Sequence, residues 1–262
     1  MRNIAGNMTK KIGVILLSGG LDSTTVAAYA IKEGYELVGL TIRYGQKHSR
    51  EITSAKKVAK ILEIKHEIID ISFFKKLAWY SALTTNGEFT IPQQRDKNEM
   101  LKDIPITYVP FRNTLFITLA AAFVESKALN LIEREKIDPG EIQASIFIAA
   151  NAIDYSGYPD CRPEYYEQMA KVIWLGSKLG VQYHMPINIM TPIISKTKAE
   201  IIKMAMDLKA PLEYTWSCYE GGETPCGKCD SCILRAKGFT EAGYEDPSLR
   251  ELEGHSKNAK SK

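Results

Sequence analysis

Residues 16–25, LLSGGLDSTT, join a short apolar run to two glycines, an acid and four hydroxyl side chains. The residues before the glycines, KKIGVILL (10–17), have the β-branched and aliphatic density of a buried strand. The residues after them, TTVAAYAIKEG (24–34), have the apolar spacing of a helix, with a glycine where the helix should end. The stretch therefore predicts a strand, a glycine loop and a helix in direct succession.

A loop of this kind can bind a phosphate. The first turn of a helix has backbone N–H groups without partners, and the helix dipole places partial positive charge there. Gly19 and Gly20 let the backbone approach an anion closely, and the hydroxyls of the stretch could donate to it. The alternative is an ordinary turn in which Asp22 or Ser23 caps the helix. The full string SGGLDS after a strand favours the phosphate loop.

SGGLDS (18–23) is similar to the pyrophosphate loop, or PP-loop, of the ATP-pyrophosphatase family. Members of that family activate a carbonyl oxygen with AMP and release pyrophosphate. The P-loop pattern G-x-x-x-x-G-K-[ST] does not occur in the chain, so adenylation is favoured over transfer of a γ-phosphate. The resemblance implies that ATP is bound by one continuous run of residues: Leu17, Ser18, Gly19, Gly20, Leu21, Asp22, Ser23, Thr24, Thr25, Val26 and Ala27.

Strands and helices are expected to alternate along the rest of the chain, which predicts an α/β fold with a doubly wound, mostly parallel sheet. Ligands of such sheets bind beyond the carboxyl ends of the strands, where the glycine loop lies. Two segments, 84–107 and 131–141, interrupt the alternation, and the first is interpreted as a mobile excursion over the site. The expected strands are 35–45, 65–72, 142–153 and 181–188, and the expected helices are 49–64, 114–129, 165–179 and 197–210.

Four of the five cysteines lie in CYEGGETPCGKCDSC (218–232), with gaps of seven, two and two residues. This spacing suits one structural Zn²⁺ bound by four thiolates, with no position left for water. An iron–sulfur cluster and free thiols are the alternatives, but the ferredoxin spacing and its following proline are absent. The predicted zinc ligands are Cys218, Cys226, Cys229 and Cys232, within a zinc-binding segment at 214–235.

Composition limits the other function classes. The net charge of +3 over 262 residues is small, and part of the basic excess lies in GHSKNAKSK (254–262), so a disordered basic tail is expected over about 250–262. No interior stretch shows the basic face of a nucleic-acid binder. The N-terminal apolar run is too short for a signal peptide or a membrane span. We expect a cytoplasmic protein with one domain over 1–262 and no membrane or direct nucleic-acid partner.

Five further segments are similar, in order, to the 7-cyano-7-deazaguanine synthase family. The resemblance implies that 7-carboxy-7-deazaguanine, ammonia and ATP yield the nitrile through adenylated intermediates, on the route to queuosine or archaeosine in tRNA. It also suggests a homodimer and Mg²⁺ with the ATP. The segments are YGQKH (44–48), VPFRN (109–113), DYSGYPDCRPEYY (154–166), TPIISKTKAEI (191–201) and TWSCYEGGETPCGKCDSC (215–232).

The same resemblance assigns roles to single residues. Asp22 would organise the loop or Mg²⁺, Lys198 would reach the phosphates, and Arg112 would add charge, although Phe111 precedes it where the family usually has a small residue. These three are the expected catalytic residues. The role of Cys161 stays open. The expected residues for binding the flat heterocycle are Tyr155, Tyr158, Asp160 and Arg162.

Two other functions are weighed against this one. The first is a PP-loop enzyme that adenylates a different acceptor, such as a tRNA-thiolating enzyme, and the DYSGYPDC segment argues against it. The second is a zinc-ribbon module that binds RNA without turnover, against which the near-neutral charge counts.

Overall fold

The computed structural model describes residues 9–46, 49–84, 88–94, 103–153 and 158–249. Strand β1 (Lys10–Leu16) leads through the glycine loop into helix α1 (Leu21–Lys32), as the sequence predicts. The apolar residues of β1 form a strand because the sheet buries both of its faces, and Ile12, Val14 and Ile15 are wholly buried. The expected tail at about 250–262 lies outside the described residues.

The strands of the described chain form one parallel sheet in the order β3-β2-β1-β4-β5, which confirms the doubly wound fold. The connections run outward from β1 in both directions, first to β2 and β3 and then to β4 and β5. The order therefore reverses beside β1, and the crevice at the carboxyl ends of β1 and β4 is where such sheets bind ligands. The other strands are β2 (Glu36–Arg43), β3 (Lys65–Asp70), β4 (Ile142–Phe147) and β5 (Ile187–Met190).

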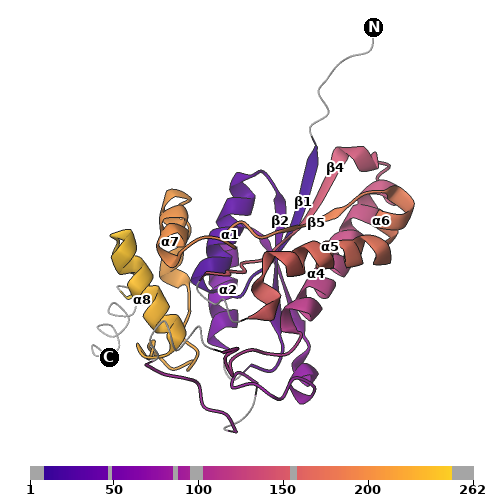
Figure 1. The fold of residues 1–262 in the computed structure, drawn as a ribbon. Helices are drawn as coiled ribbons and strands as arrows, with labels where there is room; N and C mark the ends of the chain where they lie inside the picture. The colour runs from indigo at the N-terminus through magenta and orange to yellow at the C-terminus, as the bar shows by residue number, and fades with distance from the viewer. Residues whose placement is uncertain (1–8, 47–48, 85–87, 95–102, 154–157, 250–262) are drawn as a thin grey trace, which may run out of the picture.

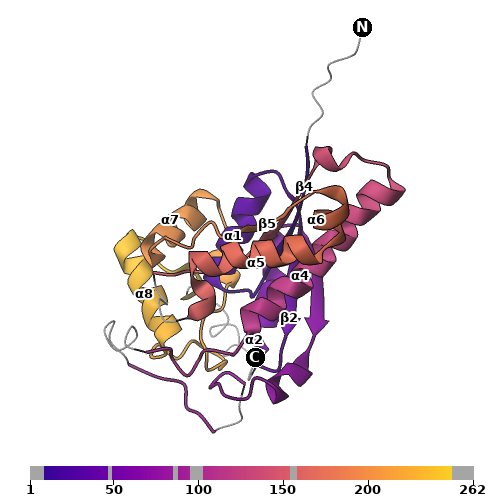
Figure 2. The same cartoon turned by 45° about the vertical axis from the view of Figure 1, so that its right-hand side comes forward.

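Helices cover both faces of the sheet, as Figure 1 shows. One core joins the sheet to α4, α5 and α6, and a second joins its other face to α1, α2 and α7. Turning the view brings α4 and α5 forward across the first of these faces (Figure 2). The remaining helices are α2 (Arg50–Ile61), α4 (Arg112–Leu129), α5 (Pro163–Gly176), α6 (Lys178–Tyr183), α7 (Lys198–Asp207) and α8 (Asp230–Ala242).

Short helical turns complete the described secondary structure. A π-helical turn extends α4 into the segment 131–141, which the sequence treats only as a charged excursion. The turns are η1 (Ser72–Lys76), η2 (Asn130–Arg134), η3 (Pro139–Glu141), η4 (Pro159–Cys161) and η5 (Leu212–Tyr214).

The helix from Arg112 to Arg134 is long and apolar enough to cross a membrane by length and composition alone. In the structure it lies along the sheet, and Ile117, Ala120 and Val124 are buried in the core. Its apolar character is therefore explained by packing on β1 and β4, and the helix expected over 114–129 is confirmed.

Two expectations for 165–188 are wrong. The single helix expected over 165–179 is two helices, because Ser177 is extended and its Oγ accepts a hydrogen bond from Gly180 N at 3.0 Å, which starts α6. The strand expected over 181–188 begins only at Ile187, since the chain is helical as far as Tyr183. The apolar residues of α6 mimic a strand because the helix is short.

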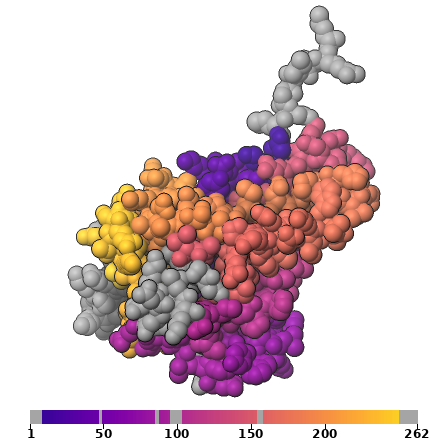
Figure 3. Space-filling view, in the orientation of Figure 1, coloured from indigo at the N-terminus to yellow at the C-terminus, as the bar shows by residue number. Residues whose placement is uncertain are grey.

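The C-terminal part adds two helices that pack against each other. Thr197 Oγ1 accepts from Glu200 N at 3.3 Å and Thr197 N donates to the Glu200 carboxylate at 2.8 Å. This capping box starts α7 where the sequence expects the helix of 197–210 to begin. Helix α8 was not predicted, although Asp230 at its start and the left-handed Gly243 after its end are ordinary helix signals. Figure 3 shows these orange and yellow segments side by side at the left of the molecule.

Candidate active site

A cavity of ≈ 310 Å³ lies at the carboxyl ends of β1, β2 and β4, beside the glycine loop. Its wall includes loop residues such as Ser18 and Gly20, together with Arg112 from the start of α4. The four-cysteine segment and α8 contribute Trp216 and Arg235. Segments far apart in the chain therefore meet around the predicted ATP loop.

Gly19 permits the shape of the loop. Its φ of +80° lies in the left-handed region, and a Cβ there would come within 2.4 Å of Ala55 N and Glu51 O in α2. Glycine is therefore required both for backbone conformation and for space. On the other side of the loop, Trp216 N donates to Gly19 O at 2.9 Å, which ties the cysteine segment to the loop.

The start of α1 presents its backbone amides without a side-chain cap. The N-cap residue is Gly20 and makes no side-chain hydrogen bond, so neither Asp22 nor Ser23 caps this helix. The first helical bond runs from Thr24 N to Gly20 O, at 3.1 Å. The earlier amides of the turn are thus outside the helical bonding pattern, and such groups bind anions. Ser18 Oγ lies 2.9 Å from Ser23 Oγ at the same place.

The residues expected to bind ATP fall into two groups, one that forms the cavity wall and loop and one that is buried inside α1. Leu17, Ser18, Gly20, Leu21, Asp22 and Ser23 line the cavity, and Gly19 supports the loop from behind. The last four residues of the run are wholly buried inside α1 and do not line the cavity. Their assignment to ATP stays a prediction. These four are Thr24, Thr25, Val26 and Ala27.

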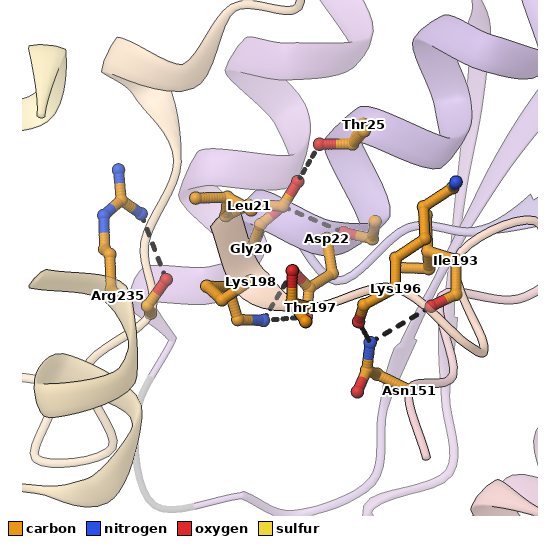
Figure 4. A network of polar contacts seen from close by, with 12 residues as sticks. Gly20, Leu21, Asp22, Thr25, Asn151, Ile193, Lys196, Thr197, Lys198 and Arg235 are labelled. Carbon is orange, nitrogen blue, oxygen red and sulfur yellow. Dashed lines mark hydrogen bonds and ion pairs between the residues drawn. The ribbon is translucent and has the colours of Figure 1, made fainter. Parts of the chain in front are cut away.

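Lys198 and Asp22 meet at the cavity wall. Lys198 Nζ is 2.8 Å from both carboxylate oxygens of Asp22, and the two side chains are 12% and 30% exposed. Figure 4 shows Lys198 directed at this carboxylate, with Asn151 nearby. Asn151 Nδ2 donates to the carbonyls of Ile193 and Lys196 and so holds the segment that leads into α7. The contact places an ammonium group beside the loop.

Arg112 also lines the cavity, and Phe111 before it adopts a left-handed conformation with φ of 56°. Its guanidinium lies 5.9 Å from the ring centre of Tyr44. Burial acts against the charge, but Tyr44, Tyr158 and Asp160 together raise the pKa of Arg112. The guanidinium therefore stays charged and can bind an anionic group inside the cavity.

The four residues expected to bind the heterocycle are only partly brought together. Tyr158 lines the cavity, and its hydroxyl lies 2.8 Å from Thr107 Oγ1. Asp160 is buried behind the wall, where desolvation raises its pKa. Arg162 is exposed at the N-cap of α5 and is not among the residues that line the cavity. Tyr155 lies outside the described residues.

Cys161, whose role the sequence leaves open, lines the cavity as a buried thiol. Burial raises its pKa to about 12, so at neutral pH it is protonated and unreactive.

Other residues of the cavity wall were not predicted. Glu51 comes from the first turn of α2, and Trp216, Tyr219 and Arg235 come from the C-terminal part. Arg235 is held by an ion pair with Asp246 at 2.6 Å. The sequence offers one signal for Glu51, its position three residues after YGQKH (44–48). The apolar periodicity of its helix does not show which loop the helix packs against.

The four-cysteine segment forms a cluster that could hold a metal ion. All four Sγ atoms lie within 4.8 Å of one another, and Cys226 Sγ is 4.0 Å from Cys232 Sγ. A tetrahedral Zn²⁺ with bonds of about 2.3 Å requires sulfurs about 3.8 Å apart. Backbone amides support the sulfurs, since Cys226 N donates to Cys218 Sγ and Cys229 N to Cys226 Sγ, both at 3.3 Å. The residues therefore fit a metal bound by four thiolates.

The segment 84–107 approaches this cluster in its described part. Gln93 pairs with Cys229 in an isolated antiparallel bridge, and Gln94 N donates to Lys228 O at 2.9 Å. The excursion is thus attached to the cysteine segment, and its expected role as a cover over the site stays a prediction.

Solved structures of similar fold are distant. The structure of NMN synthetase from Francisella tularensis is 16% identical, with a TM-score of 0.39, and covers 92% of this chain and 81% of that chain. A 4-thiouridine synthetase bound to RNA and ATP is 15% identical, with a TM-score of 0.38, over 94% of this chain and 53% of that chain. These similarities are too low to bear on the activity.

Sequence relatives are much nearer. The 7-cyano-7-deazaguanine synthase of Thermoplasma acidophilum is 48% identical over 240 residues, which cover 92% of each chain. The protein of that name from Microcystis aeruginosa is 42% identical over 94% of this chain and 100% of its own. A family model described as "Queuosine biosynthesis protein QueC" matches residues 12–243. With nearly the whole fold inside that match, the chain belongs to the QueC family.

Proposed function

We propose that this protein is an ATP-dependent ligase that converts 7-carboxy-7-deazaguanine and ammonia to 7-cyano-7-deazaguanine, for queuosine or archaeosine synthesis. The observation that carries the proposal is the similarity to relatives named 7-cyano-7-deazaguanine synthase over 92% of both chains. The loop and the cavity beside it support the same reaction, because adenylation needs a place for pyrophosphate next to a place for an acid.

The reaction needs two activations. A carboxylate resists ammonia because its oxygen leaves poorly, so it first attacks the α-phosphate of ATP and becomes an acyl adenylate. Ammonia then displaces AMP and forms the amide. The amide oxygen attacks a second ATP, and loss of AMP and protons yields the nitrile. The protein has to align the acid with the α-phosphate and to stabilise the departing pyrophosphate.

The residues around the cavity suit these tasks. The amides at the start of α1 and the hydroxyls of Ser18 and Ser23 would bind the pyrophosphate. Lys198 would exchange its contact with Asp22 for the phosphates, leaving the carboxylate to organise the loop or a Mg²⁺ that accompanies ATP. Arg112 would bind the carboxylate of the substrate or the α-phosphate, both of which are anions in need of a buried cation.

The heterocycle would lie between the loop and Tyr158, whose ring lines the cavity. Asp160 is placed to act indirectly, since its buried carboxyl faces Arg112. Tyr155 and Arg162 remain proposed substrate ligands on the basis of the family resemblance.

The four-cysteine cluster would bind one Zn²⁺ in a structural role. Four sulfur ligands fill the tetrahedral shell and leave no position for water. Bound zinc would fix the segment that places Trp216 against Gly19. We infer in addition a cytoplasmic homodimer without direct nucleic-acid contacts, which gel filtration with light scattering would test for the oligomer.

A single reaction mixture tests the proposed activity. Purified protein is incubated with ATP, Mg²⁺, an ammonium salt and the carboxylated deazapurine, and the products are identified by mass spectrometry. The expected products are the nitrile, AMP and pyrophosphate, with none formed when the deazapurine is omitted. Formation of ADP in place of AMP would rule out adenylation.

A further inference from the structure

Glu51 is a carboxylate on the cavity wall that the roles above leave unused. It lies in the first turn of α2, which packs against the loop at Gly19. Two carboxylate residues line the described wall, and the other, Asp22, is held by Lys198. Within the part of the chain that the structure describes, the Glu51 side chain makes no hydrogen bond or ion pair. Glu51 therefore lines the cavity with no hydrogen-bond or ion-pair partner among the described residues.

The surroundings of Glu51 do not favour the ionised carboxylate, so a contribution to folding stability does not explain the residue at this position. A carboxylate in the first turn of a helix gains from the helix dipole, and the neighbouring charge of Arg112 lowers the pKa of Glu51. Burial outweighs the effect of Arg112 and raises the pKa of Glu51 to about 7. The other charged or titratable groups around the cavity are Asp22 from α1, Tyr44 after β2, Lys198 from α7, Arg235 from α8, and Tyr158, Cys161 and Tyr219 from connecting segments.

The proposed reaction requires a base at the nitrogen. When ammonia attacks the acyl adenylate, a C–N bond forms, the C–O bond to AMP breaks, and one N–H proton has to leave. In the second round, the amide oxygen bonds to the α-phosphorus of ATP as the bond from that phosphorus to pyrophosphate breaks. The C≡N bond then forms as the C–O bond to AMP breaks, and two further N–H protons are lost over these two steps. Nothing is oxidised or reduced, and AMP carries away the electron pair of each broken C–O bond.

We propose that the Glu51 carboxylate is the general base that takes these protons from the reacting nitrogen and releases them to solvent through the cavity. The inference rests on the proposed function. Position supports it, because Glu51 lines the same cavity as the loop that would hold the phosphates and as Arg112, which would hold the acid. Its environment supports it too, since a base works best when its pKa is near the working pH. A lysine or arginine with the ordinary pKa of its side chain is protonated at neutral pH and cannot act as this base.

The test separates adenylation from the steps that remove protons. Glu51→Gln keeps the size of the side chain and removes the base. Exchange of radiolabelled pyrophosphate into ATP, driven by the carboxylated deazapurine without ammonia, involves no nitrogen and should be unchanged. Ammonia-dependent formation of amide and nitrile should fall by about 10²-fold or more. Glu63→Gln, an exposed position just beyond the end of α2, is the matched control and should retain both activities.

A pH profile gives a readout that a structural role would not move. At constant free ammonia, the wild-type aminolysis rate should rise with pH through about 7 and then level off, because the protonated Glu51 cannot accept a proton. The rise should vanish in Glu51→Gln and persist, at a lower plateau, in Glu51→Asp. Unfolding midpoints confirm that the variants are folded.

Each other outcome overturns the inference in a recognisable way. If Glu51→Gln loses pyrophosphate exchange as well, the residue acts on the loop or on ATP and not on nitrogen. If it makes nitrile at the wild-type rate, the base lies elsewhere. If the wild type itself shows neither exchange nor nitrile, the proposed function has failed first, and the wild-type reactions alone reveal it.

Discussion

Replacing Gly19 by alanine should damage the loop much more than the same change at Gly34. Both glycines are left-handed, with φ of +80° and +83°, so both variants pay the left-handed penalty of about 1–2 kcal/mol. Only at Gly19 does the new Cβ meet backbone, at 2.4 Å from Ala55 N and from Glu51 O, whereas nothing lies within 4 Å at Gly34. Overpacking of this kind adds about 1–3 kcal/mol.

The difference between the two variants isolates the contact between the loop and α2. Urea unfolding of Gly19→Ala and Gly34→Ala gives both free energies, and calorimetric titration with ATP gives both affinities. We expect Gly19→Ala to lose the additional free energy from its unfolding free energy or, if the loop shifts, from its free energy of ATP binding. A loss of about 1–3 kcal/mol in binding corresponds to a roughly 5- to 150-fold weaker affinity for ATP. Equal stability and equal ATP affinity in the two variants would refute the reasoning.

Three further predictions concern the metal cluster and two ion pairs. Cys226→Ala should abolish metal binding and increase protease cleavage inside the four-cysteine segment while the α/β body stays folded, and full activity of a folded, metal-free variant would contradict the structural role. Lys198→Met should slow pyrophosphate exchange by about 10²-fold. The unfolding midpoint should change little, because the partner Asp22 keeps access to solvent. An unchanged exchange rate would show that Lys198 has no role in binding the phosphates. Asp246→Ala should cost about 3 kcal/mol at pH 7, as breaking a buried pair does, because Arg235 and Asp246 are each 9% exposed. Burial raises the pKa of Asp246, but hydrogen bonds from Arg235 outweigh it and leave the folded pKa below the ordinary value. This stabilisation is therefore complete above the ordinary aspartate pKa of about 3.9 and is lost as the pH falls through the lowered pKa of the folded protein. Urea unfolding at pH 7 and at a pH below the folded pKa should show the free-energy difference between wild type and variant shrinking in acid.

Elements with a clear periodicity were predictable from the sequence. The strand, loop and helix around SGGLDS and the start of a helix at Thr197 rest on local signals, and the structure confirms them. The alternation of strands and helices predicted a doubly wound, mostly parallel sheet, which the structure also confirms. The region 165–188 was not predictable in the same way. A six-residue helix, α6, has too few turns to show a helical period, so its apolar residues could as well belong to a strand.

In the candidate site, too, some residues were predictable from the sequence and others were not. Motif residues such as Asp22, Lys198 and Arg112 were named from the sequence, and the structure brings all three to one cavity. Glu51 and Arg235 also line that cavity and carry no motif of their own in the sequence. Conversely, Arg162 belongs to the DYSGYPDCRPE segment but is exposed at the start of α5 and is not among the residues that line the cavity.

By itself the sequence determined which chemistry the chain can support, because a glycine loop before a helix and four closely spaced cysteines are local patterns that need only their neighbours. Only the tertiary structure decided how these patterns are joined. The contact of Trp216 with Gly19 and the placing of Glu51 on the cavity wall link residues that are distant in the chain or lie on separate elements. Such contacts depend on how helices pack across a sheet, and no local period or spacing encodes that packing.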